Sequence, residues 1–203
     1  QSGSHYFLTM NQLFARVRRV SSWSFVVSAA ISAYVIYFSY ITVQIHRGIG
    51  TSAYDFGLYD QGIWLLSQGK TPFVTLMGRN LFGDHTSFIL LPLVPLMWVF
   101  SSTSLLFVVQ TVVIASGAIP VYAYARKQLE SDALGCMFAC TYLLYPTVSW
   151  TNVENYHPDS FLGVFIATAL YAAFESKWRM YIIAVLLAMS VKEDVSLILI
   201  PLG

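Results

Sequence analysis

Ser87–Phe100 reads SFILLPLVPLMWVF, and whether this stretch crosses a membrane decides the orientation of every segment that follows it. Its 14 residues would make about 21 Å of α-helix, against a hydrocarbon core of about 30 Å. Pro92 and Pro95 each remove a backbone donor and clash with the preceding turn. Because the stretch is short and interrupted, a crossing and a non-crossing topology have to be compared.

The composition is that of an integral membrane protein. Of 203 residues, 57% are apolar and only 10% are charged, whereas a soluble domain has about 25% charged residues. At about 20 residues per span, the chain has room for about five transmembrane helices. A net charge of +1 provides no basic field for nucleic acid, so a nucleic-acid partner is excluded.

The first span is expected at 23–45, and Arg16, Arg18 and Arg19 precede it. The positive-inside rule places this basic N-terminal end in the cytoplasm, and the polarity of the next segment makes 46–104 a large outer loop. Within that loop, 58–68 (LYDQGIWLLSQ) is too short to span and fits an interfacial helix. Residues 1–9 resemble a protease-site and tag remnant, which leaves 10–203 as a single membrane domain.

Basic residues discriminate between the two topologies. If 87–100 crosses, the later spans 105–125, 133–150 and 160–178 leave only three of eleven basic residues in the cytoplasm. If it does not cross, the number is seven, because Arg126, Lys127, Lys177 and Arg179 join the N-terminal arginines. We therefore expect 87–100 to stay at the outer interface or to re-enter, and the last span, 180–203, to start inside.

The non-crossing topology collects acidic residues at the outer face. Lys192, Glu193 and Asp194 come 12 residues into the last span, about 18 Å into the hydrocarbon. Ionisable groups at that depth usually mark a functional site. Seven of the ten acidic residues then share one outer or outer-membrane region: Asp55, Asp60, Asp84, Glu154, Asp159, Glu193 and Asp194.

Several of these residues have a structural interpretation beside the functional one. Asp55 stands where a helix-capping carboxylate would be, and Asp60 is about 140° further around the helix, so the two do not share a face. Asp84-His85 and His157-Pro-Asp159 each bring an imidazole near a carboxylate, which can fix the tautomer of the imidazole, but both also suit turns and helix starts. Mg²⁺ or Mn²⁺ would suit such ligands, although no spacing specifies a metal.

The order of short motifs resembles a known family. The motifs are Asp55–Gln61 (DFGLYDQ), Gly69–Pro72 (GKTP), Gly83–His85 (GDH) with Pro92 and Pro95, Asn155–Asp159 (NYHPD), and Lys192–Asp194 (KED). Together they look like an uncharacterised family of predicted bacterial and archaeal membrane proteins. That family is similar to the GT-C glycosyltransferases, which include protein mannosyltransferases, aminoarabinose transferases and oligosaccharyltransferases.

The resemblance implies a GT-C-like N-terminal half of an all-α fold in a prokaryotic cell membrane, with an outward-facing site. Its enzymes transfer a sugar from a polyprenyl-phosphate carrier, so a lipid-linked sugar donor and membrane lipid are the expected partners. Asp55 matches the catalytic carboxylate at the start of the first juxtamembrane helix, and Asp159 or Glu154 matches the second acidic group. His85 is the third catalytic candidate. The expected substrate-binding residues are Asp60, Asp84, Arg79, Glu154, His157, Lys192, Glu193 and Asp194.

The chain also departs from that pattern, because the usual module is longer and has more than five spans. We therefore expect a fragment, a reduced member, or a half that pairs with another membrane polypeptide. Two further functions stay open. One is a non-catalytic subunit or scaffold of a larger membrane complex, and the other is a transporter or proton-relay protein, which would also use Lys192–Asp194.

Overall fold

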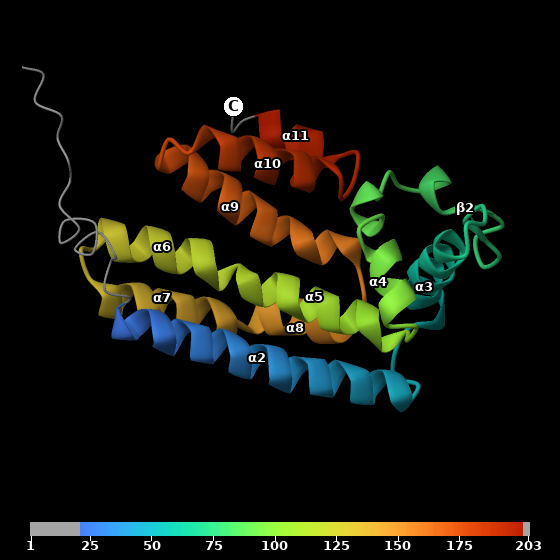
Figure 1. The fold of residues 1–203 in the computed structure, drawn as a ribbon, viewed down its shortest axis with the longest axis horizontal. Coiled ribbons are helices and arrows are strands. Elements are labelled where there is room, and N and C mark those ends of the chain that lie inside the picture. Colours follow the sequence, from blue (N-terminus) through green and yellow to red (C-terminus); the bar gives the residue numbers. More distant parts are fainter. Residues whose placement is uncertain (1–20, 201–203) are drawn as a thin grey trace, which may run out of the picture.

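The structure is a computed structural model that describes residues 21–200. The described chain is mostly helical and forms an elongated bundle (Figure 1). Two helical stretches, Ser22–Arg47 (α2) and Ser104–Gln128, are long and apolar enough to cross a membrane. They agree with the expected spans at 23–45 and 105–125. Arg16, Arg18 and Arg19, on which the expected orientation partly rests, lie outside the described residues.

The other helices are shorter. They are α7 (Asp132–Leu144), α8 (Pro146–Glu154), α9 (Leu162–Phe174), α10 (Trp178–Met189) and α11 (Val195–Leu199). Helix α2 packs on α5 (Ser104–Ser116) and on α7, and α9 packs on α10, so the long segments run side by side in the bundle (Figure 1). Helix α2 exposes Phe25, Ile36 and Tyr40, and such an exposed apolar surface is typical of membrane contact.

Two of the expected spans are interrupted in the structure. The stretch 133–150 divides into α7 and α8 because Pro146 forces Tyr145 into an extended conformation, with φ −66° and ψ 124°. The stretch 180–203 is not one helix either, since α10 ends at Met189 and α11 starts at Val195. Lys192, Glu193 and Asp194 therefore lie in a turn between two helices, which corrects their expected place inside a continuous span.

The span from Ser104 to Gln128 consists of α5 (Ser104–Ser116) and α6 (Ala118–Gln128), joined at Gly117. Gly117 has helical angles, so it continues the direction of α5. A Cβ at Gly117 would lie 2.2 Å from the hydroxyl oxygen of Tyr142, which donates a hydrogen bond of 2.8 Å to the carbonyl of Ile114. Glycine is thus required here by the close approach of α7.

The first connection, residues 48–103, joins α2 to α5 and covers one end of the bundle (Figure 1). It contains α3 (Ala53–Ser67), an antiparallel pair of strands, β1 (Phe73–Val74) and β2 (Arg79–Asn80), two 3₁₀ turns, Leu81–Gly83 (η1) and Phe88–Leu90 (η2), and α4 (Leu93–Val99). Helix α3 starts five residues before the expected 58–68.

The proline-containing stretch Ser87–Phe100 folds as η2 and α4. The seven residues of α4 span about 10 Å. Helix α4 packs on α3, and the Trp98 indole donates a hydrogen bond of 2.8 Å to the carbonyl of Ser67. Under this connection lies an apolar core in which the rings of Phe56 and Phe107 stack with their centroids 4.8 Å apart. The connection is therefore anchored to α5.

A second core joins α2, α5–α6 and α7. Ala115, Ala118 and Ala139 are fully buried in it, and Tyr34 and Leu143 fill the space around them. Small side chains at helix contacts let backbones approach closely, which is the usual way that helices pack in membranes. This core fixes the bundle that carries the loops at its two ends.

Candidate functional site

Most of the acidic residues singled out above lie at the end of the bundle that the first connection covers. We call this end the acidic end; it carries Asp55, Asp84, Asp159 and Glu193. Four separate segments supply these residues: the start of α3, the loop after η1, the 3₁₀ turn Pro158–Phe161 (η3), and the turn between α10 and α11.

Asp55 lies in the first turn of α3 but does not cap it. The cap is Ser52, whose hydroxyl accepts a hydrogen bond of 3.2 Å from the Asp55 amide. This corrects the capping interpretation of Asp55, because a serine three residues earlier already satisfies that need. Within residues 21–200, the Asp55 carboxylate makes no hydrogen bond or ion pair, so it is available to a ligand.

The loop after η1 is joined to the α10–α11 turn through Glu193. One carboxylate oxygen of Glu193 lies 2.9 Å from Nδ1 of His85, and the other accepts a hydrogen bond of 3.1 Å from the Thr86 amide. These bonds hold the pKa of Glu193 well below its usual range, at about 2. Asp84 lies beside His85 and forms an ion pair with Arg79. His85 and Arg79 are therefore both engaged within the protein.

A second contact attaches the same turn to η3. Nζ of Lys192 lies 3.6 Å from a carboxylate oxygen of Asp159. The same turn is also joined to η2, because the Ile89 amide donates a hydrogen bond of 2.9 Å to the carbonyl of Ser190. The expected triad Lys192–Asp194 is therefore divided in its contacts: Lys192 turns to η3 and Glu193 to the first connection. Asp194 is exposed immediately before α11.

Tyr59, on α3, lines a small cavity together with Asp84 and His85, and the sequence analysis missed it. Its ring makes edge contacts with the rings of Tyr156 and His157, at centroid distances of 5.6 and 6.3 Å. Burial raises the pKa of Tyr59 to about 12, and the carboxylates of Asp159, Asp84 and Asp55 add to the effect. The negative charges of these three residues therefore add to the effect of burial on one hydroxyl group.

Gln110 holds the loop that carries Asp159, and the sequence analysis missed it too. It is fully buried in α5, and its amide nitrogen donates to the carbonyls of Asn152, at 3.3 Å, and Asn155, at 2.8 Å. Its amide oxygen accepts from the His157 amide, at 2.9 Å, and from the Ser160 hydroxyl, at 3.2 Å. A glutamine in an otherwise apolar run was the signal that could have identified it.

Three of the expected site residues lie apart from Tyr59 or add little to its surroundings. Asp60 and Asp55 are about 140° apart around α3, so they face different sides of the helix. Burial raises the pKa of Asp60, and its Oδ1 is buried without a hydrogen-bond partner among residues 21–200. Glu154 is exposed at the end of α8. His157 contributes its backbone amide to Gln110 and its ring to the Tyr59 contact.

An apolar groove leads to Asp159. Its volume is about 310 Å³, and it lies between α5, α7, α8 and the start of α9. Asp159 and Ser160 lie in its lining together with apolar and uncharged residues such as Ile114, Val148 and Val164. Gly163 leaves open space there, because a Cβ at this position would meet no atom within 4 Å. The groove therefore combines an apolar wall with one carboxylate.

The donor set does not form a metal centre by itself. Among residues 21–200, no group of three or more histidine, cysteine, aspartate or glutamate side chains is placed to hold a metal ion. Three carboxylates at the acidic end are paired with cationic or imidazole groups instead: Asp84 with Arg79, Glu193 with His85, and Asp159 with Lys192. We therefore derive no chemical step through Mg²⁺ or Mn²⁺.

Two helical stretches long and apolar enough to cross a membrane, with a polar cluster at one end, fit a helical membrane protein. Residues 45–203 match the model of a family described as predicted membrane protein (DUF2079), and the chain belongs to that family. No curated protein and no solved structure matched the chain. The family description names no activity, so function has to be argued from the site.

Proposed function

We propose that the chain is a membrane glycosyltransferase-like protein, or the donor-binding half of one. In this proposal it transfers a sugar from a polyprenyl-phosphate carrier to an acceptor hydroxyl at the acidic end. The observation that carries the proposal is that printed contacts hold three separate segments together at this end. The α10–α11 turn holds the loop of Asp84 through the bond between Glu193 and His85, and it holds η3 through Lys192, which lies 3.6 Å from Asp159. Carboxylates gathered at one end of the bundle suit a ligand with many hydroxyl donors, as a sugar has.

Asp55 is assigned the role of general base because its carboxylate has no partner within the described chain. It takes the proton of the acceptor hydroxyl while the acceptor oxygen bonds to the anomeric carbon of the sugar. The bond between that carbon and the phosphate oxygen breaks, and the polyprenyl phosphate leaves with its electron pair. A positioned base of this kind contributes about 10²- to 10⁴-fold to the rate.

Lys192 is assigned to the leaving phosphate. Arg79 is already paired with Asp84, whereas Lys192 holds Asp159 at 3.6 Å and keeps a quarter of its side chain exposed, 26%. An ammonium group beside the leaving oxygen stabilises the negative charge that develops there. His85 is a positioning residue in this proposal, because its ring is bonded to Glu193 and thereby fixes the loop that carries Asp84.

The groove at Asp159 is the proposed place for the lipid part of the donor. Its apolar wall suits a polyprenyl chain, and its charged end brings the attached phosphate towards Lys192 and Asp159. Burying such a chain contributes about 0.8 kcal/mol for each CH₂ removed from water. In this proposal the acidic end faces outwards and the first connection lies along the outer membrane surface.

Two measurements on the full chain in lipid nanodiscs test the proposal. The first measures binding of a polyprenyl phosphate and of the matching polyprenol, which lacks only the phosphate. We expect the phosphate form to bind more tightly, Gly163→Leu to weaken both by filling the groove, and Lys192→Gln to weaken the phosphate form alone.

The second measurement is sugar transfer from a polyprenyl-phosphate donor, with the partner chain present if one co-purifies. Asp55→Asn should abolish turnover with the melting temperature unchanged, and Asp132→Asn, at the other end of the bundle, serves as the matched control. Turnover that survives Asp55→Asn would remove that residue from the mechanism. A stoichiometric membrane complex without polyprenyl-phosphate binding would favour the scaffold function, and substrate-driven ion flux in liposomes would favour transport.

A further inference from the structure

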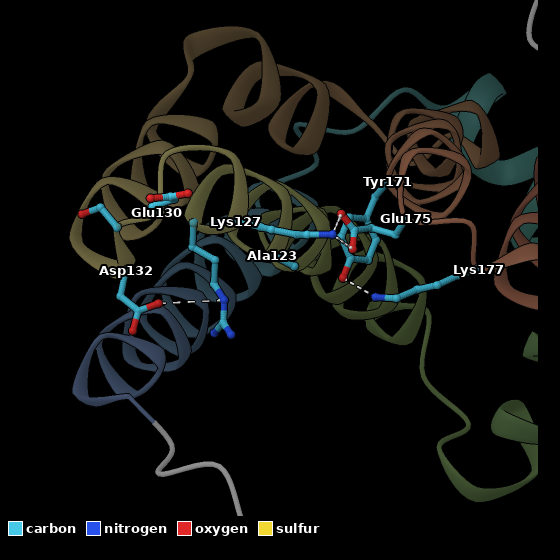
Figure 2. Close-up of a pocket in the computed structure, with 9 residues that line it drawn as sticks. Ala123, Lys127, Glu130, Asp132, Tyr171, Glu175 and Lys177 are labelled. Carbon is cyan, nitrogen blue, oxygen red and sulfur yellow. Dashed lines mark hydrogen bonds and ion pairs between the residues drawn. The ribbon is translucent and has the colours of Figure 1, made fainter. Parts of the chain in front are cut away.

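A large cleft lies at the opposite end of the bundle, which we call the basic end. It has a volume of about 900 Å³, within the range of small-molecule sites. It lies between the last turn of α6, the first turn of α7 and the α9–α10 turn, and Figure 2 shows its charged lining. Its lining residues are Ala123, Arg126, Lys127, Glu130, Ser131, Asp132, Tyr171, Glu175 and Lys177.

Two of the three carboxylates in this cleft are already neutralised. Both oxygens of Glu175 accept hydrogen bonds from Nζ of Lys127, at 2.9 and 2.7 Å, and only 10% of the Glu175 side chain is exposed. Asp132 lies 3.9 Å from Nε of Arg126 and also stands in the first turn of α7, where a negative charge is favourable. These two acids therefore leave little free negative charge.

Of the three cations that line the cleft, Lys177 is the one that has no ion pair with a described residue. Its ammonium group donates to the Tyr171 hydroxyl and lies 4.3 Å from the centre of the same ring, but no carboxylate of residues 21–200 lies within ion-pair distance. Glu130, the remaining acid of the lining, lies towards the other side of the cleft in Figure 2. The side of the cleft at Lys177 therefore carries uncompensated positive charge.

The start of α10 adds to that charge. Lys177 is its N-cap residue, no side chain caps its free amides, and its first turn contains Arg179 and no acidic residue. Cations at the positive end of a helix are unfavourable, and an anion placed there would relieve them. Beside the cleft, Phe174 and Trp178 are 63% and 61% exposed, as aromatic side chains are at a membrane interface.

We propose that this cleft binds the phosphodiester of an anionic phospholipid headgroup, with Lys177 as its main contact. The apolar residues beside the cleft favour a lipid over a free anion, because the acyl chains of a lipid would cover Phe174 and Trp178. Basic pockets between helix ends are known to bind such headgroups. This site is separate from the acidic end and does not depend on the proposed transfer reaction.

Native mass spectrometry of the full chain, purified in detergent and mixed with defined lipids, tests this site. We expect phosphatidylglycerol to be retained and phosphatidylcholine to be lost. Lys177→Gln should weaken phosphatidylglycerol retention about fivefold, which corresponds to about 1 kcal/mol for one basic residue near a headgroup. Lys177→Arg should restore it, and Lys70→Gln, an exposed lysine of the first connection, should change nothing.

Three results would overturn the proposal. One is equal retention of phosphatidylglycerol and phosphatidylcholine, and another is unchanged retention in Lys177→Gln. The third is competition by inorganic phosphate as strong as competition by the lipid, which would mean a site for a free anion. Circular dichroism melting of each variant separates loss of binding from loss of fold.

Discussion

Replacing Gln110 by leucine should loosen the loop that carries Asp159. The side chain is fully buried, and the substitution removes four hydrogen bonds at once. The carbonyl of Asn155 and the amide of His157 then have no other hydrogen-bond partner in the described chain. A buried polar group left without a partner costs about 1–3 kcal/mol, so the two together cost about 2–6 kcal/mol.

Thermal unfolding in detergent measures this effect. For a chain of this size each kcal/mol lowers Tm by about 2–4 °C, so we expect Gln110→Leu to lower it by about 10 °C. Gln68→Leu is the matched control, because Gln68 is exposed and, within residues 21–200, its side-chain amide bonds only to the Ser67 hydroxyl. Surface changes of this kind usually stay within about 0.5 kcal/mol.

Hydrogen exchange gives a local test of the same reasoning. The His157 amide should exchange much faster in Gln110→Leu, because its acceptor is the Gln110 side chain. A Tm within about 2 °C of the parent protein, together with an unchanged exchange rate for this amide, would show that Gln110 does not hold the loop.

Two further predictions concern a helix contact and a pH response. Gly117→Ala should lower stability by about 1–3 kcal/mol, because its Cβ would overlap the Tyr142 hydroxyl. Gly163→Ala, where a Cβ meets open space, should leave Tm unchanged or raise it. Equal melting temperatures of the two variants would contradict the close approach of α7 to Gly117. The pKa of Glu193 is lowered to about 2 by its bonds to His85 and Thr86, so its stabilising effect is complete above its unfolded value of about 4.3 and is lost as pH falls through about 2. Exchange at the Thr86 amide should therefore rise over that range in the parent protein, and an equal rise in Glu193→Gln would argue against this origin.

Hydropathy predicted the two longest helical stretches, Ser22–Arg47 and Ser104–Gln128, because long apolar runs are their main signal. It did not predict where the shorter helices break. The division of 133–150 at Pro146 follows from the steric clash that a proline makes with the residue before it. Hydropathy alone does not detect this break, because the run is apolar on both sides of Pro146. The depth of Lys192–Asp194 in the apolar run favours a position inside a span, but three adjacent charges are also a reason for a helix to end, and the structure has a turn there.

The candidate site was predictable in composition and less so in its contacts. Sequence selected the acidic residues of the first connection and of the Asn155–Asp159 motif, which meet at one end of the bundle. It did not find Tyr59, since a tyrosine beside an aspartate has no specific spacing signal. Of the two interpretations of Asp55, a catalytic carboxylate and a helix cap, the capping one is wrong, because Ser52 takes that place. Such pairings depend on which neighbour arrives in three dimensions.

The link between His85 and Glu193 also bears on how the chain is made. The two residues are 108 positions apart, so at about 5–20 residues per second the ribosome completes Glu193 some 5–20 s after His85. During that interval the nascent loop lacks the carboxylate that later holds it. The link between the loop of His85 and the α10–α11 turn therefore forms late in biosynthesis, and a chain released before Glu193 would lack it.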